Sequence, residues 1–136
     1  MINAEVTEQN RDAINALTSQ VIRAAMKVHT ALGPGLLENA YRACLTHELR
    51  RSGLRVQTEA YLPVHYEGIT VDLGYRIDLL VEDQVVVELK AVESVLPVHK
   101  AQLLSYLRLS NKRVGLLINF HAARLKDGIN RIVNGF

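Results

Sequence analysis

The chain has 136 residues, among which 16 Lys or Arg and 14 Asp or Glu give a formal net charge of +2. At this length we expect one domain that buries roughly two-thirds of its unfolded surface and folds without disulfides. The single cysteine, Cys44, excludes a disulfide framework and a zinc knuckle and fits a reducing compartment.

The N-terminal region and the hydropathy pattern point away from membranes. Residues 1–15 are polar and acidic, unlike the basic start and apolar stretch of a secretory signal. No apolar run approaches the roughly 18 residues that a membrane helix needs. We therefore expect a cytoplasmic protein without membrane association, in which residues 1–136 form one domain and about residues 1–10 are a polar extension.

Two helices are predicted first. Apolar residues recur at helical spacing over about residues 10–32, and Gly33-Pro34-Gly35 then ends the pattern. A second helix is predicted from about Leu36 to Ser52, with Gly53 as its C-terminal cap. Glu38 lies in the first turn of this helix, where the helix dipole stabilises a carboxylate whatever its other role.

Extended patterns follow, interrupted at Glu67-Gly68 and at Glu82-Asp83-Gln84. They predict an antiparallel meander over Arg55–Thr58, Tyr61–Tyr66, Val71–Val81 and Val85–Val92.

The last third of the chain alternates between helix and strand patterns. A leucine-rich helix is predicted after Pro97, followed by a buried strand at Val114–Phe120 and a short basic helix over about Ala123–Val133. The order of elements predicts an α/β fold with a mixed central β-sheet flanked by helices.

Charge is distributed unevenly along the chain. Residues 1–98 carry 9 basic and 13 acidic residues, whereas residues 99–136 carry 7 basic residues and one acidic residue. Such a basic segment could steer a polyanion toward the protein, although a solvated surface would give the same pattern. The basic residues concerned are Lys100, Arg108, Lys112, Arg113, Arg124, Lys126 and Arg131.

Three charged residues interrupt two otherwise apolar strands: Asp78, Glu88 and Lys90. An ionised carboxylate in an apolar sheet is costly unless a cation or strong hydrogen bonds compensate it. Two carboxylates and a lysine in these strands therefore indicate a candidate metal site.

The loop between the strands decides whether the two carboxylates meet. Glu88 and Lys90 are two apart on one strand and share a face. A three-residue loop Glu82-Asp83-Gln84 would place Asp78 opposite Glu88, whereas a two-residue loop would separate them. Because this sequence lacks the Asn-Gly or Asp-Gly pair of a two-residue hairpin, the longer connection or a bulge is expected.

Oxygen ligands of this kind suit Mg²⁺ or Mn²⁺, and such an ion can activate water for attack on a phosphodiester. Lys90 beside carboxylates should stay protonated and could orient the water or neutralise charge on the phosphoryl oxygens. The alternative is a structural salt bridge between Lys90 and Asp78 or Glu88.

The residues around this candidate site resemble a known family. Asp78 followed by Glu88-Leu89-Lys90 is similar to the signature of PD-(D/E)XK nucleases, with Ile77 in the place of the proline. Gly35, Glu38 and Tyr41 match the spacing of the GxxExxY proteins, a branch of that superfamily. Further matches are Val28-His29, Leu32-Gly33-Pro34-Gly35, Gly74-Tyr75-Arg76-Ile77-Asp78, Val87-Glu88-Leu89-Lys90-Ala91, His99, Gln102-Leu103-Leu104, Tyr106 and Leu117-Ile118-Asn119-Phe120, so that the resemblance covers about residues 14–135.

The resemblance implies a restriction-endonuclease-like core with a metal site made by Glu38, Asp78 and Glu88, and with Lys90 as the catalytic lysine. It also implies that Gln102 and Tyr106, one helical turn apart, approach the site. For these two residues the alternative is a polar edge on an amphipathic helix.

Three further residues are candidates for supporting roles. His29 could contact phosphate or hold Glu38, or could be a packing or surface residue. Tyr41 is one turn from Glu38 and could orient it, although a core tyrosine is the default. Arg76 shares a strand face with Asp78 and could bind phosphate or neutralise the acids.

The leading hypothesis is a Mg²⁺-dependent or Mn²⁺-dependent nuclease that cuts nucleic acid, with DNA favoured over RNA, in repair, processing or defence. Two alternatives remain open: a non-catalytic nucleic-acid-binding or assembly module on the same fold, and an ion-paired structural core whose surface binds protein. A homodimer or a recruiting protein partner is compatible with each.

Overall fold

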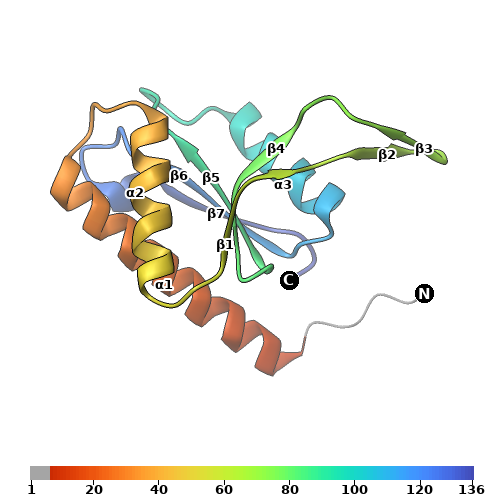
Figure 1. Ribbon diagram of the computed structural model, residues 1–136, viewed down its shortest axis with the longest axis horizontal. Coiled ribbons are helices and arrows are strands. Elements are labelled where there is room, and N and C mark those ends of the chain that lie inside the picture. Colours follow the sequence, from red (N-terminus) through yellow and green to blue (C-terminus); the bar gives the residue numbers. More distant parts are fainter. Residues whose placement is uncertain (1–6) are drawn as a thin grey trace.

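The computed structural model describes residues 7–136 (Figure 1). Residues 1–6 of the expected polar extension lie outside the described residues, and the first helix already begins at Glu8. In chain order the elements are α1 (Glu8–Leu32), α2 (Glu38–Arg51), β1 (Val56–Tyr61), β2 (Val64–Tyr66), β3 (Ile69–Val71), β4 (Arg76–Val81), β5 (Val85–Lys90), α3 (Pro97–Ser110), β6 (Val114–Asn119), the 3₁₀ turn η1 (Leu125–Gly128) and β7 (Ile129–Val133).

Helix α1 is bounded by two local signals. The Thr7 hydroxyl accepts a hydrogen bond from the Asn10 backbone N–H at 3.1 Å, which satisfies one of the free donors at the helix start. At the other end Gly33 has φ of 69°, a conformation that favours glycine, and its N–H donates to the His29 carbonyl at 2.7 Å. The chain then turns toward α2.

The central sheet has five strands in the order β1-β4-β5-β6-β7. Strands β5 and β6 are parallel and are joined through α3, and every other neighbouring pair is antiparallel. Helices α1 and α2 pack on one face of the sheet and α3 packs on the other (Figure 1). This is the expected α/β architecture with a mixed sheet between helical layers.

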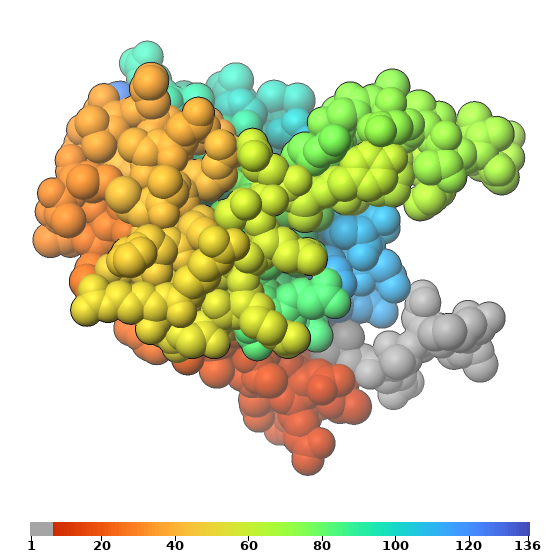
Figure 2. Space-filling view, in the orientation of Figure 1, coloured from red at the N-terminus to blue at the C-terminus, as the bar shows by residue number. Residues whose placement is uncertain are grey.

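The predicted meander is only partly correct, because β1 pairs directly with β4 while β2 and β3 form a separate two-stranded ribbon. Pro63 has no N–H to continue the first strand. Between β3 and β4, the Asp72 side chain accepts a hydrogen bond from the N–H of Gly74, whose φ is 78°. The ribbon projects from the body of the molecule (Figures 1 and 2).

The predicted basic helix at Ala123–Val133 is wrong: this segment forms η1 and then strand β7. Strand β7 pairs antiparallel with β6, so it supplies backbone partners to an edge that would otherwise be open. Ile129 and Ile132 contact the apolar clusters on opposite faces of the sheet. The segment therefore forms a strand because β6 offers backbone hydrogen-bond partners along its open edge.

Candidate active site

The loop from β4 to β5 has the three-residue length expected, because Val81 pairs with Val85, Leu80 with Val86 and Leu79 with Val87. Glu82 and Asp83 both adopt positive φ, of 51° and 54°. Extending this register places Asp78 opposite Glu88, so the loop brings the two carboxylates to one position in the sheet.

At that position, hydrogen bonds to side chains replace the backbone–backbone hydrogen bonds of the regular ladder. The Asp78 N–H donates to the Glu88 Oε1 atom at 3.2 Å, and the Leu89 N–H donates to the Asp78 Oδ2 atom at 2.9 Å. Each carboxylate thus binds the backbone of the other strand. Both side chains are fixed in orientation before any ligand binds.

Burial gives Glu88 an unusual electrostatic state. Glu88 is 7% exposed, and burial, followed by the negative charge of Asp78 and their side-chain hydrogen bond, raises the Glu88 pKa from 4.5 to about 9. Lys90 and the Asp78 backbone act in the opposite direction. Two neighbouring carboxylates of this kind accept a cation readily, because a cation relieves their mutual repulsion.

Glu38 begins α2 and approaches the same position. Burial and the charge of Asp78 raise the Glu38 pKa, whereas Lys90 and Arg42 lower it. Within residues 7–136, however, no three His, Cys, Asp or Glu side chains are grouped closely enough to hold a metal ion. Asp78 and Glu88 thus offer two adjacent carboxylates, the oxygen donors that divalent ions prefer, and Glu38 is electrostatically coupled to Asp78 without completing a three-ligand cluster.

Lys90 ends β5 opposite Asn119 of β6. Its carbonyl accepts the Phe120 N–H at 2.9 Å, and the buried Asn119 side chain bonds both the N–H and the carbonyl of Val92, so the backbone around Lys90 is held firmly. None of the ion pairs within 4.0 Å among residues 7–136 involves Lys90. The direct salt bridge to Asp78 or Glu88 considered from the sequence is not formed.

The sequence reasoning missed Arg42. Its Nη1 atom lies 3.7 Å from Asp78 Oδ1 and 3.3 Å from Glu59 Oε1, and its Nη2 atom donates to Asn39 at 2.9 Å. Arg42 is four residues after Glu38 and so lies on the same helix face. The four-residue spacing from Glu38 could have indicated that Arg42 lies on the side of α2 that carries Glu38. It could not indicate which strands of the sheet this side of α2 faces.

Tyr41 contacts the preceding loop. Its hydroxyl donates to the Gly33 carbonyl at 2.5 Å and accepts from the Leu36 N–H at 3.1 Å. Its ring is fully buried and stacks on Phe120 with centroids 4.5 Å apart. Tyr41 is thus a core residue that fixes the turn leading into Glu38, and its hydroxyl is committed to backbone atoms.

Gln102 and Tyr106 approach the carboxylates from the other face of the sheet. The Gln102 Nε2 atom donates to the Tyr106 hydroxyl at 3.2 Å. Burial raises the Tyr106 pKa, and the negative charges of Glu88 and then, more weakly, Tyr75 and Asp78 act in the same direction. Helices α2 and α3 therefore reach the two carboxylates from opposite sides.

Arg76 begins β4 and is exposed. Its guanidinium lies over the Tyr61 ring, 4.9 Å from the centroid, and donates to the Tyr75 carbonyl at 2.9 Å. No ion pair among residues 7–136 involves Arg76, so it does not neutralise the acids through a direct pair.

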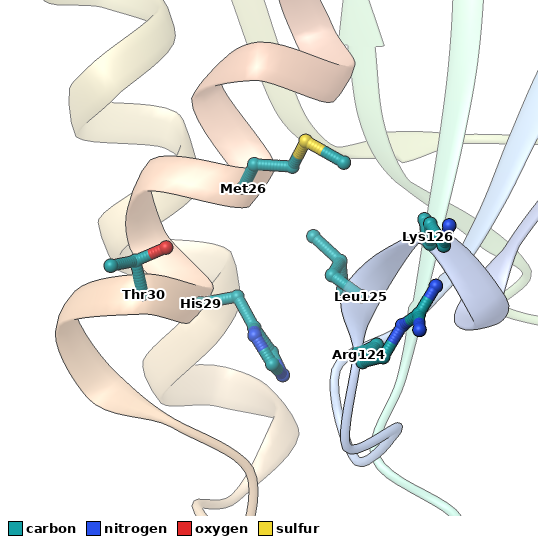
Figure 3. A pocket seen from close by; sticks show the side chains of 6 residues that line it. All are labelled: Met26, His29, Thr30, Arg124, Leu125 and Lys126. Atoms are coloured by element: carbon teal, nitrogen blue, oxygen red, sulfur yellow. The ribbon is translucent and has the colours of Figure 1, made fainter.

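His29, near the end of α1, contacts the segment that follows β6. Its Nε2 atom hydrogen-bonds the Ala122 carbonyl at 2.9 Å, which ties the end of α1 to the segment after β6. It lines a pocket of about 340 Å³ between α1 and η1 (Figure 3). The other lining residues are Met26, Thr30, Arg124, Leu125 and Lys126.

No helix among residues 7–136 combines the length and apolar character required to cross a bilayer.

A family model described as the PD-(D/E)XK nuclease superfamily matches residues 15–132, which include the three candidate acids and Lys90. Comparisons with curated proteins and with solved structures give no match. Because the family match extends from α1 to β7 and the fold is the expected one, the chain belongs to the PD-(D/E)XK nuclease superfamily.

Proposed function

We propose that this protein is a nuclease that hydrolyses phosphodiester bonds in nucleic acid with Mg²⁺ or Mn²⁺, and that DNA is its substrate. Members of its superfamily are usually nucleases that use divalent metals. The observation that carries the proposal is the juxtaposition of Asp78 and Glu88 by reciprocal hydrogen bonds beside a Lys90 that forms no ion pair in residues 7–136. The G-x-x-E-x-x-Y spacing of Gly35, Glu38 and Tyr41 supports placement in the GxxExxY branch.

In this proposal Asp78 and Glu88 hold the ion, with Glu38 as the third acid. A bound divalent ion would supply an activated water and would stabilise charge on the phosphate. Lys90 provides an ammonium without an ion pair in residues 7–136 on a hydrogen-bonded backbone, suited to orienting the water or to neutralising phosphoryl oxygens. Arg42, which contacts Asp78, limits the repulsion between the acids and an approaching polyanion.

Two basic residues of the C-terminal segment form ion pairs with acidic residues. Lys112 pairs with Asp83 at 3.1 Å and Arg124 pairs with Asp127 at 3.6 Å. These pairs are wholly or partly exposed and therefore weak, so the segment retains a net positive field that would favour encounter with nucleic acid.

A second candidate is a nucleic-acid-binding module that does not cleave. The observation that favours it is that Glu38, Asp78 and Glu88 do not form a ready three-ligand cluster within residues 7–136. Under this alternative the carboxylates would hold the strands together through their hydrogen bonds to the backbone, and Lys90 would contact phosphate.

The test is cleavage of labelled single-stranded and duplex DNA and RNA with Mg²⁺, Mn²⁺ or EDTA. The proposal predicts metal-dependent cleavage that Glu88→Gln abolishes and that Lys90→Ala lowers by about 10²- to 10³-fold. Gln57→Ala, an exposed change on β1, serves as the surface control and should leave cleavage unchanged. Binding without cleavage under any metal would favour the second candidate.

A further inference from the structure

An exposed aromatic and cationic pair lies beside the candidate site. Tyr61 is 49% exposed at the end of β1, and it pairs in register with Arg76 at the start of β4. The Arg76 guanidinium lies over the Tyr61 ring at 4.9 Å. One face of this ring thus has a planar cation on it, the arrangement of a cation–π pair.

The pair lies near Asp78 at the β1 edge of the sheet. Arg76 and Asp78 are two residues apart on β4, about 6.8 Å along the strand, although regular alternation breaks between them, because Ile77 and Leu79 pack in apolar clusters on opposite faces. Tyr61 is the cross-strand partner of Arg76 and lies on the edge strand β1, which also contains Glu59, and Arg42 contacts both Glu59 and Asp78. A flexible ligand that follows this open edge can therefore reach both the pair and Asp78.

The charge of Arg76 is available to a ligand. Arg42 is paired with Glu59 and Asp78, whereas no ion pair within residues 7–136 involves Arg76. The segment between the two residues carries negative charge, because residues 62–75 contain Glu67 and Asp72 and no Lys or Arg. The ribbon beyond the pair is thus poorly suited to a polyanion, and the Tyr61–Arg76 pair is where a nucleic-acid strand would gain contacts.

We propose that Tyr61 and Arg76 form a stacking subsite for an unpaired nucleobase next to the carboxylates, which makes single-stranded nucleic acid the substrate; this rests on the proposed nuclease function. In a duplex both faces of each base are covered by neighbouring bases, so a side-chain stack gains nothing from it. In a single strand an aromatic ring or a guanidinium can cover a free base face, whatever the sequence. The Arg76 charge would also attract the adjoining phosphate.

The test measures binding separately from cleavage. The full chain is kept in EDTA at low ionic strength, and fluorescence anisotropy gives its affinity for three labelled probes: a single DNA strand, a strand of equal length made of abasic sites, and a duplex. Wild type should bind the base-bearing strand more tightly than the abasic strand. Tyr61→Ala should weaken binding of the base-bearing strand by roughly 5- to 150-fold and leave the abasic strand unchanged.

Three variants separate stacking from other effects. Tyr61→Phe keeps the ring and should bind like wild type. Arg76→Lys keeps the charge without the planar group, and should weaken binding of the base-bearing strand alone. Tyr66→Ala removes a tyrosine that is 63% exposed on the projecting ribbon and should change nothing. Melting curves establish that each variant is folded. Because the substituted positions are exposed, we expect the substitutions to leave the fold intact.

The outcomes distinguish this subsite from the nuclease function itself. The subsite would be overturned if Tyr61→Ala lost affinity equally for the base-bearing and the abasic strand, or lost no affinity for either. Wild-type binding of the duplex as tight as that of the single strand would also overturn it. Metal-dependent cleavage with unchanged binding by Tyr61→Ala would overturn the subsite and leave the nuclease function in place. Base-dependent binding through Tyr61 without cleavage would support the subsite and count against the nuclease. No binding of any probe by wild type would overturn both.

Discussion

Asp78 and Glu88 are joined by a hydrogen bond from the Asp78 N–H to the Glu88 carboxylate at 3.2 Å, and the Asp78 carboxylate accepts the Leu89 N–H at 2.9 Å in return. The side chains therefore have a structural role beside the proposed catalytic one, because they replace ladder hydrogen bonds between β4 and β5. This dual role means that removing a whole carboxylate would confuse loss of function with loss of structure. Isosteric amides, which keep an accepting oxygen, are the informative substitutions.

Divalent ions should stabilise the fold. At a Mg²⁺ concentration 100 times its Kd, binding to the folded state alone adds about 2.7 kcal/mol to the free energy of unfolding. The shift in Tm between Mg²⁺ and EDTA, followed by circular dichroism, measures this effect. Asp78→Asn and Glu88→Gln should each abolish the shift, whereas Glu59→Gln, outside the metal-ligand set, should retain it. An unchanged Tm in wild-type protein at all Mg²⁺ concentrations would contradict metal binding.

Stability should depend on pH through Glu88. Its pKa is raised from 4.5 to about 9 in the folded protein, so between these values the unfolded chain has lost a proton that the folded protein keeps. The contribution of this group to stability is therefore fully present below about pH 4.5 and is lost as pH rises toward 9.

Urea unfolding in EDTA measures this contribution directly. The experiment covers roughly pH 5 to 9, because a carboxyl group with a raised pKa titrates in this range. The free energy of unfolding of wild type should fall more steeply with pH than that of Glu88→Gln, which cannot ionise. Parallel pH profiles for the two proteins would show that Glu88 has an ordinary pKa.

Lys90→Ala should separate catalysis from metal binding. Because Lys90 forms no ion pair within residues 7–136, its loss should leave the Mg²⁺-induced Tm shift intact. Cleavage should fall by about 10²- to 10³-fold, the range for removing one group that stabilises the transition state. Lys100→Ala, an exposed lysine on α3, is the matched control. Loss of the Tm shift in Lys90→Ala would instead assign the lysine to the metal site.

Tyr41→Phe should destabilise the protein by about 1 kcal/mol, because two backbone groups lose their hydroxyl partner while the stack on Phe120 is kept. Urea unfolding measures the change, and Tyr66→Phe on the exposed ribbon provides the comparison. Wild-type stability in Tyr41→Phe would show that water satisfies the Gly33 carbonyl and the Leu36 N–H equally well.

Several features of the fold could be predicted from local sequence. The Glu82-Asp83-Gln84 loop lacks the residues of a two-residue turn, which favoured the longer connection or a bulge, and the structure has the three-residue connection that brings Asp78 opposite Glu88. Likewise, the alternation along β5 predicted that Val87 and Leu89 face one apolar layer while Glu88 points away from it. Both are short-range properties, set by chain geometry over a few residues.

Other features depend on partners distant in sequence. The spacing of Ala123–Val133 suited a helix, but the open edge of β6 made a strand of Ile129–Val133. Arg42 could be placed on the face of Glu38, but only the packing of α2 against the sheet brought it to Asp78 and Glu59. Nothing local to Tyr41 indicated that its hydroxyl would bind the loop instead of Glu38.

The sequence by itself determined the α/β order of elements, the strand positions of the charged residues and the family, because these follow from periodicity and from a motif read along the chain. The tertiary structure decided which groups meet: that Asp78 and Glu88 bind each other's strand, that Lys90 has no ion-pair partner within residues 7–136, and that Tyr61 carries Arg76 on its ring. The physical reason is that burial, electrostatic coupling and stacking depend on distances across the fold, which chain position alone does not set.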